Sequence, residues 1–331
     1  MRRRMDRKNK KKKHIMISLL TIISVIIGGF FITTTVLSNI KTKKHQKMLQ
    51  AVKDKELAKK REEEKKNRLK SYEYPASEVE KIVARSYENS SKSEEDSKNK
   101  TESKSKGKNK KLPNNKPRKT IPKDKKIAFL TMDDGPSTTV TPKILDVLKE
   151  KGVKATFFLV GETIDQNKIS QNLVKRIYNE GHAIGNHSYT HNMKKLYPHN
   201  KLNIENFMNE VNKTNESIKK ALGKDFYSKI IRMPGGYMSR KYYNDPNLPE
   251  FNKKLKERKM HSIDWNALSG DAEGGHKNKD ELLQFLKDSI GSKKQIVILT
   301  HDTYGKESSF KALPLIIDYL KSQGYEFGTI R

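Results

Sequence analysis

The feature that most constrains the fold is an alternation of apolar runs and helical segments between residues 126 and 331. Each apolar run has the length of one strand. All but the last run precede a longer segment with helical periodicity. The runs are Ile127–Leu130, Ala155–Val160, Ala183–Ile184, Ile230–Ile231, Ser262–Ile263, Ile296–Leu299 and Tyr325–Ile330. This order is typical of a parallel sheet covered by helices. It predicts an α/β fold, a barrel or an open doubly wound sheet, with functional groups at the carboxyl ends of the strands.

A run without charged residues covers residues 15–37, and Lys and Arg residues lie on both sides of it. About 20 such residues are enough to cross a bilayer as a helix. The denser basic flank precedes the run, so the positive-inside rule places the N-terminus in the cytoplasm. We therefore expect a basic cytoplasmic tail over residues 1–14, a single transmembrane signal-anchor over 15–37, and the remainder outside the cell membrane. The alternative is a cleaved signal peptide, but the run is longer than a usual signal core.

Residues 38–124 are rich in charge and poor in large apolar side chains. This composition predicts an extracellular linker, partly helical and partly disordered, before a folded domain over residues 125–331. The net charge of +31 first suggests a nucleic-acid partner. However, most of the basic excess is scattered before residue 126 and no recognition motif accompanies it, so we expect no nucleic acid and a monomer. The absence of Cys excludes disulfides and thiolate metal ligands.

Polar and ionisable side chains follow five of the strand-like runs. These segments are Asp133-Asp134, Asn186–His191, Arg232–Tyr237, Asp264–Asn266 and Thr300–Asp302. Two adjacent carboxylates at the end of a buried strand are costly unless they meet a cation or share a proton. A surface turn is the alternative for the first segment, because Gly135-Pro136 follows it. Convergence of all five segments at one edge of the sheet indicates an enzyme site.

His187 and His191 are four residues apart. On a helical turn this spacing places both imidazoles on one face, where they can bind a single metal ion. With a carboxylate from a neighbouring strand end, two His residues form a set that leaves positions open for water and substrate. Open positions of this kind are typical of catalytic rather than structural metal sites.

Five segments resemble, in order, the five motifs of the polysaccharide deacetylases, the NodB-homology family also known as carbohydrate esterase family 4. They are Thr-Met-Asp-Asp-Gly-Pro at 131–136, His-Ser-Tyr-Thr-His at 187–191, Arg-Met-Pro-Gly-Gly-Tyr at 232–237, Ile-Asp-Trp-Asn at 263–266 and Leu-Thr-His at 299–301. The resemblance covers about residues 126–331 and implies a distorted (β/α) barrel of about seven parallel strands. The anchored layout also resembles the peptidoglycan N-acetylglucosamine deacetylases of Gram-positive bacteria.

The resemblance implies a metal site and an acid–base pair. Asp134, His187 and His191 would bind a divalent metal, with Zn²⁺ as the first choice and Co²⁺, Ni²⁺ or Mn²⁺ as alternatives. Asp133 would be the general base that takes a proton from the attacking water. His301 would be the general acid that protonates the leaving amine.

Supporting roles are implied in the same way. Arg232 would pair with Asp133 and keep it ionised. Asp264 would orient His301, with Asp271 as the alternative, because His261 stands where many members carry the first acid of an Asp-x-x-Asp-Trp motif.

Four further residues are expected to contact the substrate or its transition state. The backbone N–H of Tyr237 would stabilise the oxyanion. Trp265 would stack on a sugar, unless it is a core residue. Leu299 would line the pocket for the acetyl methyl group while also packing in its strand, and Pro234 would lie in the substrate groove.

The expected activity is metal-dependent hydrolytic N-deacetylation of N-acetylglucosamine residues in peptidoglycan, with release of acetate, on the wall side of a Gram-positive cell membrane. Another polymer is the first alternative, namely poly-N-acetylglucosamine, chitin oligomers or acetylxylan. An inactive wall-binding module that has kept the fold is the second.

Overall fold

The computed structural model describes residues 46–48, 50–51, 53–55, 72–92, 121–122 and 124–331. The chain divides into two compact units, Met1–Asn67 and Arg68–Arg331. In the first unit, the described residues form short helical stretches between positions 46 and 55. No helix within the described ranges is long and apolar enough to cross a membrane. The predicted tail over 1–14 and anchor over 15–37 lie outside those ranges and stay predictions.

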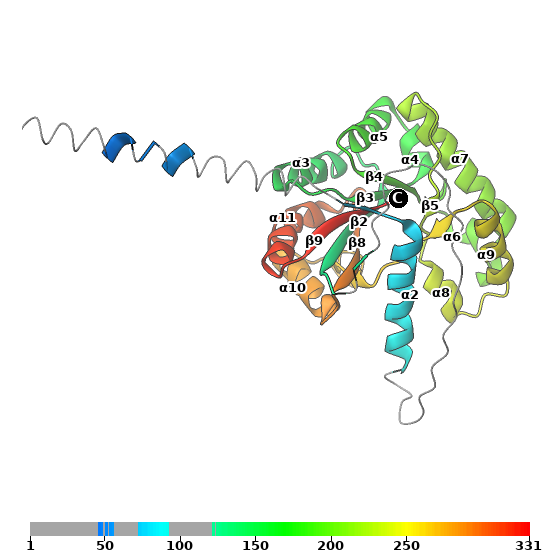
Figure 1. Cartoon of the computed structure of the whole chain (residues 1–331). Helices are drawn as coiled ribbons and strands as arrows, with labels where there is room; N and C mark the ends of the chain where they lie inside the picture. The colour runs from blue at the N-terminus through cyan, green and yellow to red at the C-terminus, as the bar shows by residue number, and fades with distance from the viewer. Residues whose placement is uncertain (1–45, 49, 52, 56–71, 93–120, 123) are drawn as a thin grey trace, which may run out of the picture. The chain divides into compact units, whose positions relative to one another are not determined.

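Strands and helices alternate along the second unit (Figure 1). The strands are β1 (Tyr72–Tyr74), β2 (Ile127–Gly135), β3 (Thr156–Leu159), β4 (Ala183–Asn186), β5 (Ile230–Ile231), β6 (His261–Ser262), β7 (Ala267–Leu268), β8 (Gln295–His301) and β9 (Glu326–Ile330). The helices are α2 (Ala76–Lys92), α3 (Thr141–Lys151), α4 (Gly161–Asp165), α5 (Lys168–Asn179), α6 (Met193–Leu196), η1 (Pro198–Asn200), α7 (Ile204–Leu222), α8 (Tyr237–Tyr242), α9 (Leu248–Glu257), α10 (Lys279–Ile290) and α11 (Glu307–Ser322). The predicted α/β class is confirmed.

The strands form one curled, parallel half-barrel. Its order is β1-β9-β2-β3-β4-β5-β6, with β8 paired to β2 and β7 paired to β8. In the described part of the chain, no pairing joins β6 to β7, so the barrel does not close there. This architecture is consistent with the expected distorted barrel, but β1 and β7 were not among the seven predicted strands.

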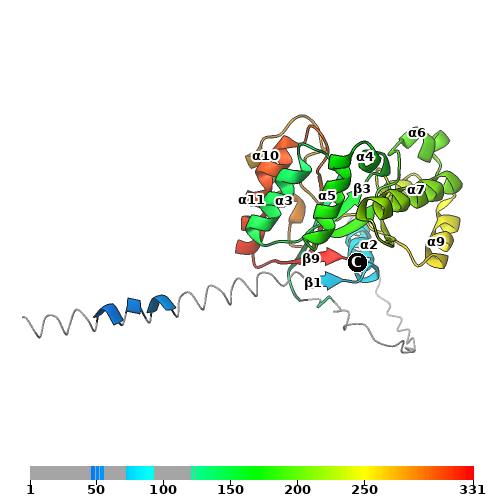
Figure 2. The same ribbon diagram turned by 90° about the horizontal axis from the view of Figure 1, so that it is seen from above.

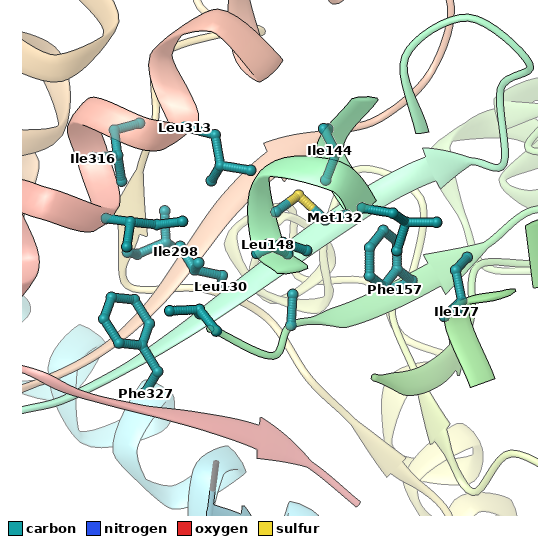
Figure 3. Close-up of a cluster of buried hydrophobic side chains, with 14 of the residues drawn as sticks. Leu130, Met132, Ile144, Leu148, Phe157, Ile177, Ile298, Leu313, Ile316 and Phe327 are labelled. Carbon is teal, nitrogen blue, oxygen red and sulfur yellow. The ribbon is translucent and has the colours of Figure 1, made fainter. Parts of the chain in front are cut away.

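The central strand β2 is buried on both faces, because alternate side chains point to opposite sides of a sheet. On the outer face, Leu130 and Met132 pack against side chains of the surrounding helices, including Leu148 of α3 and Leu313 of α11 (Figure 3). On the inner face, the row begins with Ile127 and Phe129, which belong to a separate apolar cluster.

The helix α2 fills the lower part of that inner face. Its Val79 and Val83 are buried in the same cluster as Ile127 and Phe129, and the helix contacts both β6 and β8. The strand before it, β1, pairs in parallel with β9 (Figure 2). The helix therefore covers the inner face near β6, beside the opening between β6 and β7.

The folded unit starts earlier than the sequence predicted. The predicted boundary was residue 125, and residues 38–124 were expected to be linker, whereas the compact unit begins at Arg68. Val79, Ile82 and Val83 lie on one face of α2 at a spacing typical of an amphipathic helix. Lys, Glu and Ser residues surround these three residues, so the segment has the composition of a solvated linker. For this reason the apolar face of α2 was not predicted from the sequence.

Replacement of Val79 by Ala tests whether α2 is part of the core. Val79 is fully buried, and removing two methyl groups from such a position should lower the free energy of unfolding by about 2 kcal/mol. Denaturant unfolding of residues 68–331 measures the change. Lys81→Ala is the matched control on the exposed face, and it should cost less than about 1 kcal/mol because only a surface pair with Glu78 is lost. Equal small effects of both substitutions would contradict this packing.

Candidate active site

The first two site residues lie at the end of β2. Asp133 continues the inner row of side chains and is almost fully buried, and it stands opposite His301 in the register between β2 and β8. Asp134 has a left-handed backbone conformation with φ of 69°, which costs a non-glycine residue of order 1 kcal/mol. Strain of this kind is common at functional sites. At Asp134 the strained backbone follows Asp133 directly. The two neighbouring carboxylates have different partners, Arg232 for Asp133 and the two histidines for Asp134.

Arg232, which follows β5, is the predicted partner of Asp133. Its Nη1 donates to Asp133 Oδ1 at 2.7 Å and to Thr131 Oγ1 at 2.6 Å. Its Nε and Nη2 donate to the carbonyl oxygens of Ile263 and Asp264. The side chain has no exposed surface, which excludes the alternative of a surface arginine. The charge of Asp133 is therefore paired inside the half-barrel.

Asp134, His187 and His191 form a cluster that fits a cation. The Nε2 atoms of both histidines lie 3.2 Å from Asp134 Oδ1, and one ligand atom from each residue lies within 4.8 Å of the others. Asp134 Oδ1 is buried and accepts no hydrogen bond. Although burial opposes ionisation, the two histidines hold the pKa of Asp134 well below its usual range. A buried anionic oxygen aimed at two imidazoles is the donor set of a metal site.

The local structure of the two histidines differs from the prediction. His187 and His191 lie on a loop after β4, not on a helical turn. Ser188 and His191 both have positive φ, at 65° and 51°, and this turn brings the two rings to a centroid distance of 4.9 Å. His187 Nδ1 donates to the carbonyl oxygen of Arg232 at 2.7 Å, which leaves Nε2 as the atom that faces Asp134.

The loop between the histidines is held by Glu210 of α7. Its carboxylate accepts hydrogen bonds from the backbone N–H groups of Tyr189 and Thr190, each at 3.0 Å, and from Thr190 Oγ1 at 2.7 Å. Glu210 is buried on the apolar face of α7. Sequence reasoning missed it, although a lone acid among the apolar positions of a predicted helix is a usable signal.

His301 is paired with Asp271, which was the alternative predicted from the sequence, and not with the first choice Asp264. His301 Nδ1 lies 2.8 Å from Asp271 Oδ1, and the His301 backbone N–H donates to Asp271 Oδ2. Burial opposes a charged imidazole, but the hydrogen bond and charge of Asp271 raise the pKa of His301 to about 9. The short strand β7, which pairs with β8, precedes Asp271 and brings it to this position. No strand was predicted at β7 from the sequence.

Asp264 instead organises the third motif. Its two carboxylate oxygens accept the backbone N–H groups of Tyr237 at 2.9 Å and Met238 at 2.7 Å. The N–H of Tyr237 was expected to stabilise an oxyanion, but it is already bonded to this carboxylate. Asp264 therefore fixes the start of α8 and, through its carbonyl oxygen, the side chain of Arg232.

The other three predicted substrate contacts are largely internal. Trp265 packs against the inner apolar cluster, and its carbonyl oxygen accepts a hydrogen bond from Tyr87 of α2. Pro234 is buried, and its carbonyl oxygen accepts from the Tyr197 hydroxyl. Leu299 is nearly buried in β8, two residues before His301. Contact of these residues with a substrate stays a prediction, and Trp265 matches its alternative role as a core residue.

Asp302, the residue after His301, supports the turn below the metal cluster. Its carboxyl accepts a hydrogen bond from Thr141 Oγ1 at 2.5 Å and lies so close to Gly135 that a Cβ there would clash. Its backbone N–H donates to the carbonyl oxygen of Asp133. Burial raises the pKa of Asp302 to about 7. The sequence indicated this residue only as a member of the segment Thr300–Asp302.

Substitution of Glu210 by Ala should weaken metal binding. The substitution removes the oxygen that accepts the N–H groups of Tyr189 and Thr190 and the oxygen that accepts from Thr190 Oγ1, so the loop between the histidines loses its support. Loss of an outer partner of this kind typically lowers metal affinity about 10–100-fold. Competition with a chromophoric chelator gives the affinity for Zn²⁺. Glu216→Ala, on the exposed face of the same helix, is the control. An unchanged affinity of the Glu210 variant would contradict the role.

Substitution of Asp271 by Asn should lower the pKa of His301. In the metal-free domain, the wild-type imidazole should titrate near 9, and loss of the neighbouring charge should lower this pKa by about 1–3 units. The acid form of His301 is the imidazolium, so a step that needs this form is lost as the pH rises through the pKa of His301. In the variant the pKa is lower, so the same loss occurs at a lower pH. NMR titration measures the shift, with Asp288→Asn on the exposed side of α10 as control. Equal pKa values in the wild type and the Asp271 variant would refute the pairing.

Comparison with known proteins shows the family to which the chain is related. The family model for polysaccharide deacetylase matches residues 120–248. A peptidoglycan-N-acetylglucosamine deacetylase of Bacillus cereus is 36% identical over 212 residues, which are 63% of this chain and 68% of that protein. A bifunctional xylanase/deacetylase of Pseudobutyrivibrio xylanivorans is 33% identical over 207 residues, which are 62% of this chain and 30% of that protein.

A solved structure shows the same similarity in three dimensions. The structure of a Streptococcus mutans CE4 esterase superposes with a TM-score of 0.58 at 36% sequence identity, and the match covers 63% of this chain and 87% of that one. The residues that the family model matches, 120–248, include Asp133, Asp134, His187, His191 and Arg232. The chain therefore belongs to the polysaccharide deacetylase family and is a hydrolase.

Proposed function

We propose that this protein is a metal-dependent deacetylase that hydrolyses the acetamido group of N-acetylglucosamine residues in peptidoglycan and releases acetate. The main support for the proposal is that three groups suited to this reaction lie at one edge of the sheet. A metal-binding cluster, a base paired with a buried arginine and a histidine with a raised pKa all lie at the ends of β2, β4, β5 and β8. The name of the Bacillus cereus relative supports the choice of substrate.

Asp134, His187 and His191 would hold the metal ion, and we propose Zn²⁺ because two imidazoles and one carboxylate are ligands that it prefers. When bound, the ion supplies Lewis acidity, which polarises the amide carbonyl of the substrate and makes water more acidic. The preference of His187 for Nε2 ligation is set by the protein itself, since its Nδ1–H is bonded to the Arg232 carbonyl.

Asp133 acts as the general base in this proposal. One of its oxygens is held by Arg232, while Oδ2 lies 3.6 Å from His187 Nε2 and so faces the metal cluster. The guanidinium fixes the conformation of the Asp133 side chain. Asp133 takes a proton from the water that attacks the carbonyl carbon, and a new carbon–oxygen bond forms.

His301 acts as the general acid. With a pKa near 9 in the folded protein, its imidazole is protonated at neutral pH. It donates this proton to the nitrogen of the leaving amine as the carbon–nitrogen bond breaks. The products are acetate and a glucosamine unit with a free amine. The proton held by Asp133 and a proton for His301 are exchanged with solvent before the next cycle.

Deacetylation of acetylxylan is the second candidate, and the name of the Pseudobutyrivibrio xylanivorans relative favours it. The same base and metal cluster would serve ester hydrolysis, in which the leaving group is a sugar hydroxyl. We propose an extracellular location, on the wall side of the membrane, with residues 15–37 as the anchor. This part of the proposal rests on the uncharged run and its basic flanks.

Acetate release tests the proposed activity. The protein should release acetate from chitin oligomers and from purified peptidoglycan, chelation should abolish this release, and Zn²⁺ should restore it. Asp133→Asn should lower kcat/KM by about 10²–10⁴-fold, the usual contribution of a general base. Asp146→Asn, an exposed acid on α3, is the control and should leave the rate unchanged. Activity that survives chelation or the Asp133 substitution would refute the mechanism.

The choice of polymer is decided by a parallel measurement on acetylated xylan and on muropeptides. Peptidoglycan as substrate predicts fewer glucosamine-containing muropeptides, by mass spectrometry, in cells that lack the protein. Faster acetate release from acetylxylan with unchanged muropeptides would instead support the second candidate. Release from neither polymer, with binding retained, would identify an inactive wall-binding module.

A further inference from the structure

Exposed large apolar side chains are few in the described part of the protein. They are Met48, Ile169, Met193, Tyr227, Tyr242, Tyr243 and Tyr304. Tyr304 is the one that directly follows the fifth motif, three residues after His301. It is 45% exposed, although an aromatic ring normally loses most of its surface on folding. Its position on the loop after β8, whose last residue is His301, makes it the strongest candidate for contact with a polymer.

The ring of Tyr304 is exposed but held in place. Its hydroxyl oxygen accepts a hydrogen bond from the backbone N–H of Thr138 at 3.3 Å and lies 3.1 Å from Thr138 Oγ1. Thr138 belongs to the loop after β2, which carries Asp133 and Asp134. The ring therefore bridges the loops of the first and fifth motifs. A side chain that is fixed before binding loses little conformational entropy when a ligand packs on it.

The segment around Tyr304 is also anchored beside the proposed general acid. Lys306 Nζ donates to the carbonyl oxygen of Asp271 at 2.6 Å, and Asp271 is the partner of His301. Since β2 and β8 pair with Asp133 opposite His301, the loops after both strands leave the same edge of the sheet. Tyr304 thus lies at the rim of the site on its β2–β8 side.

We propose that Tyr304 is a stacking platform for the sugar ring next to the unit that is deacetylated. A pyranose presents its C–H groups on its two faces and its hydroxyls around the edge, and a tyrosine ring offers an apolar face with a polar tip. The tip is already bonded to Thr138, so the face remains for the sugar. Trp265, which was expected to stack, is partly buried and packs against the inner apolar cluster. The inference rests on the proposed function, because it assumes a polysaccharide substrate.

Three variants of the full chain test the platform. Tyr304→Ala removes the ring, Tyr304→Phe keeps the ring and removes only the hydroxyl, and Tyr227→Ala is a matched control. Tyr227 is 46% exposed and precedes β5, so it lies toward the opposite end of the strands from the site. Thermal unfolding of each variant checks that it is folded.

Binding is measured by calorimetry on the metal-free protein with chitotetraose and with acetylated xylotetraose, so that no turnover is needed. For the oligomer that the wild type binds, Tyr304→Ala should raise Kd about tenfold. Tyr304→Phe and Tyr227→Ala should stay within about threefold of the wild type. In the active enzyme, Tyr304→Ala should raise KM for the oligomer. The kcat on 4-nitrophenyl acetate should be unchanged, because this substrate has no neighbouring sugar ring.

An oligomer Kd for Tyr304→Ala equal to that of the wild type would overturn the platform, as would equal losses on the oligomer and on 4-nitrophenyl acetate. A wild type that binds neither oligomer would overturn it as well. A wild type that binds an oligomer but releases no acetate would refute the proposed function alone, and the Kd values would still decide the role of Tyr304.

Discussion

The buried ion pair between Arg232 and Asp133 is the interaction on which the site depends. The arginine leaves the end of β5, crosses the inner face of the half-barrel and reaches β2, while two of its other nitrogens hold the carbonyl oxygens of Ile263 and Asp264. Its guanidinium also lies over the ring of Phe158, 4.2 Å from the centroid. Removal of one member of such a pair leaves an uncompensated buried charge, which costs about 3–5 kcal/mol. The same contact therefore serves stability and fixes the base.

The inner face of the half-barrel has two levels. At the lower level, Ile127 and Phe129 of β2 pack against α2, so that an N-terminal helix supplies the apolar filling that a closed barrel would take from its own strands. At the upper level, the same row of side chains continues with Thr131 and Asp133. The side chain of Arg232 occupies the space beside them and donates hydrogen bonds to both. A polar network is tolerated there because each member has a partner. The apolar level below excludes water and gives this network a rigid base.

Sequence reasoning predicted most of the partners at the strand ends, but its first choice for one histidine was wrong. Arg232 with Asp133, and Asp134 with the two histidines, were expected and are observed together. The family resemblance assigned Asp264 to His301, with Asp271 as the alternative, and Asp271 is the partner. Asp271 follows β7, a two-residue strand too short to give a periodic signal. In the same way α2 was taken for linker, because a single apolar face among lysines and glutamates is weak evidence until the surface it packs on is known.

The sequence by itself determined the α/β class, the edge of the sheet where function lies and the types of residue that meet there. These follow from local periodicity and from residue type, which are properties of short segments. Only the tertiary structure decided that Asp271 serves His301, that His187 and His191 lie on a turn with positive φ angles held by Glu210, and that the Tyr237 N–H is already bonded. Hydrogen-bond partners depend on distances of a few tenths of an ångström between segments far apart in the chain, and no local pattern encodes such distances.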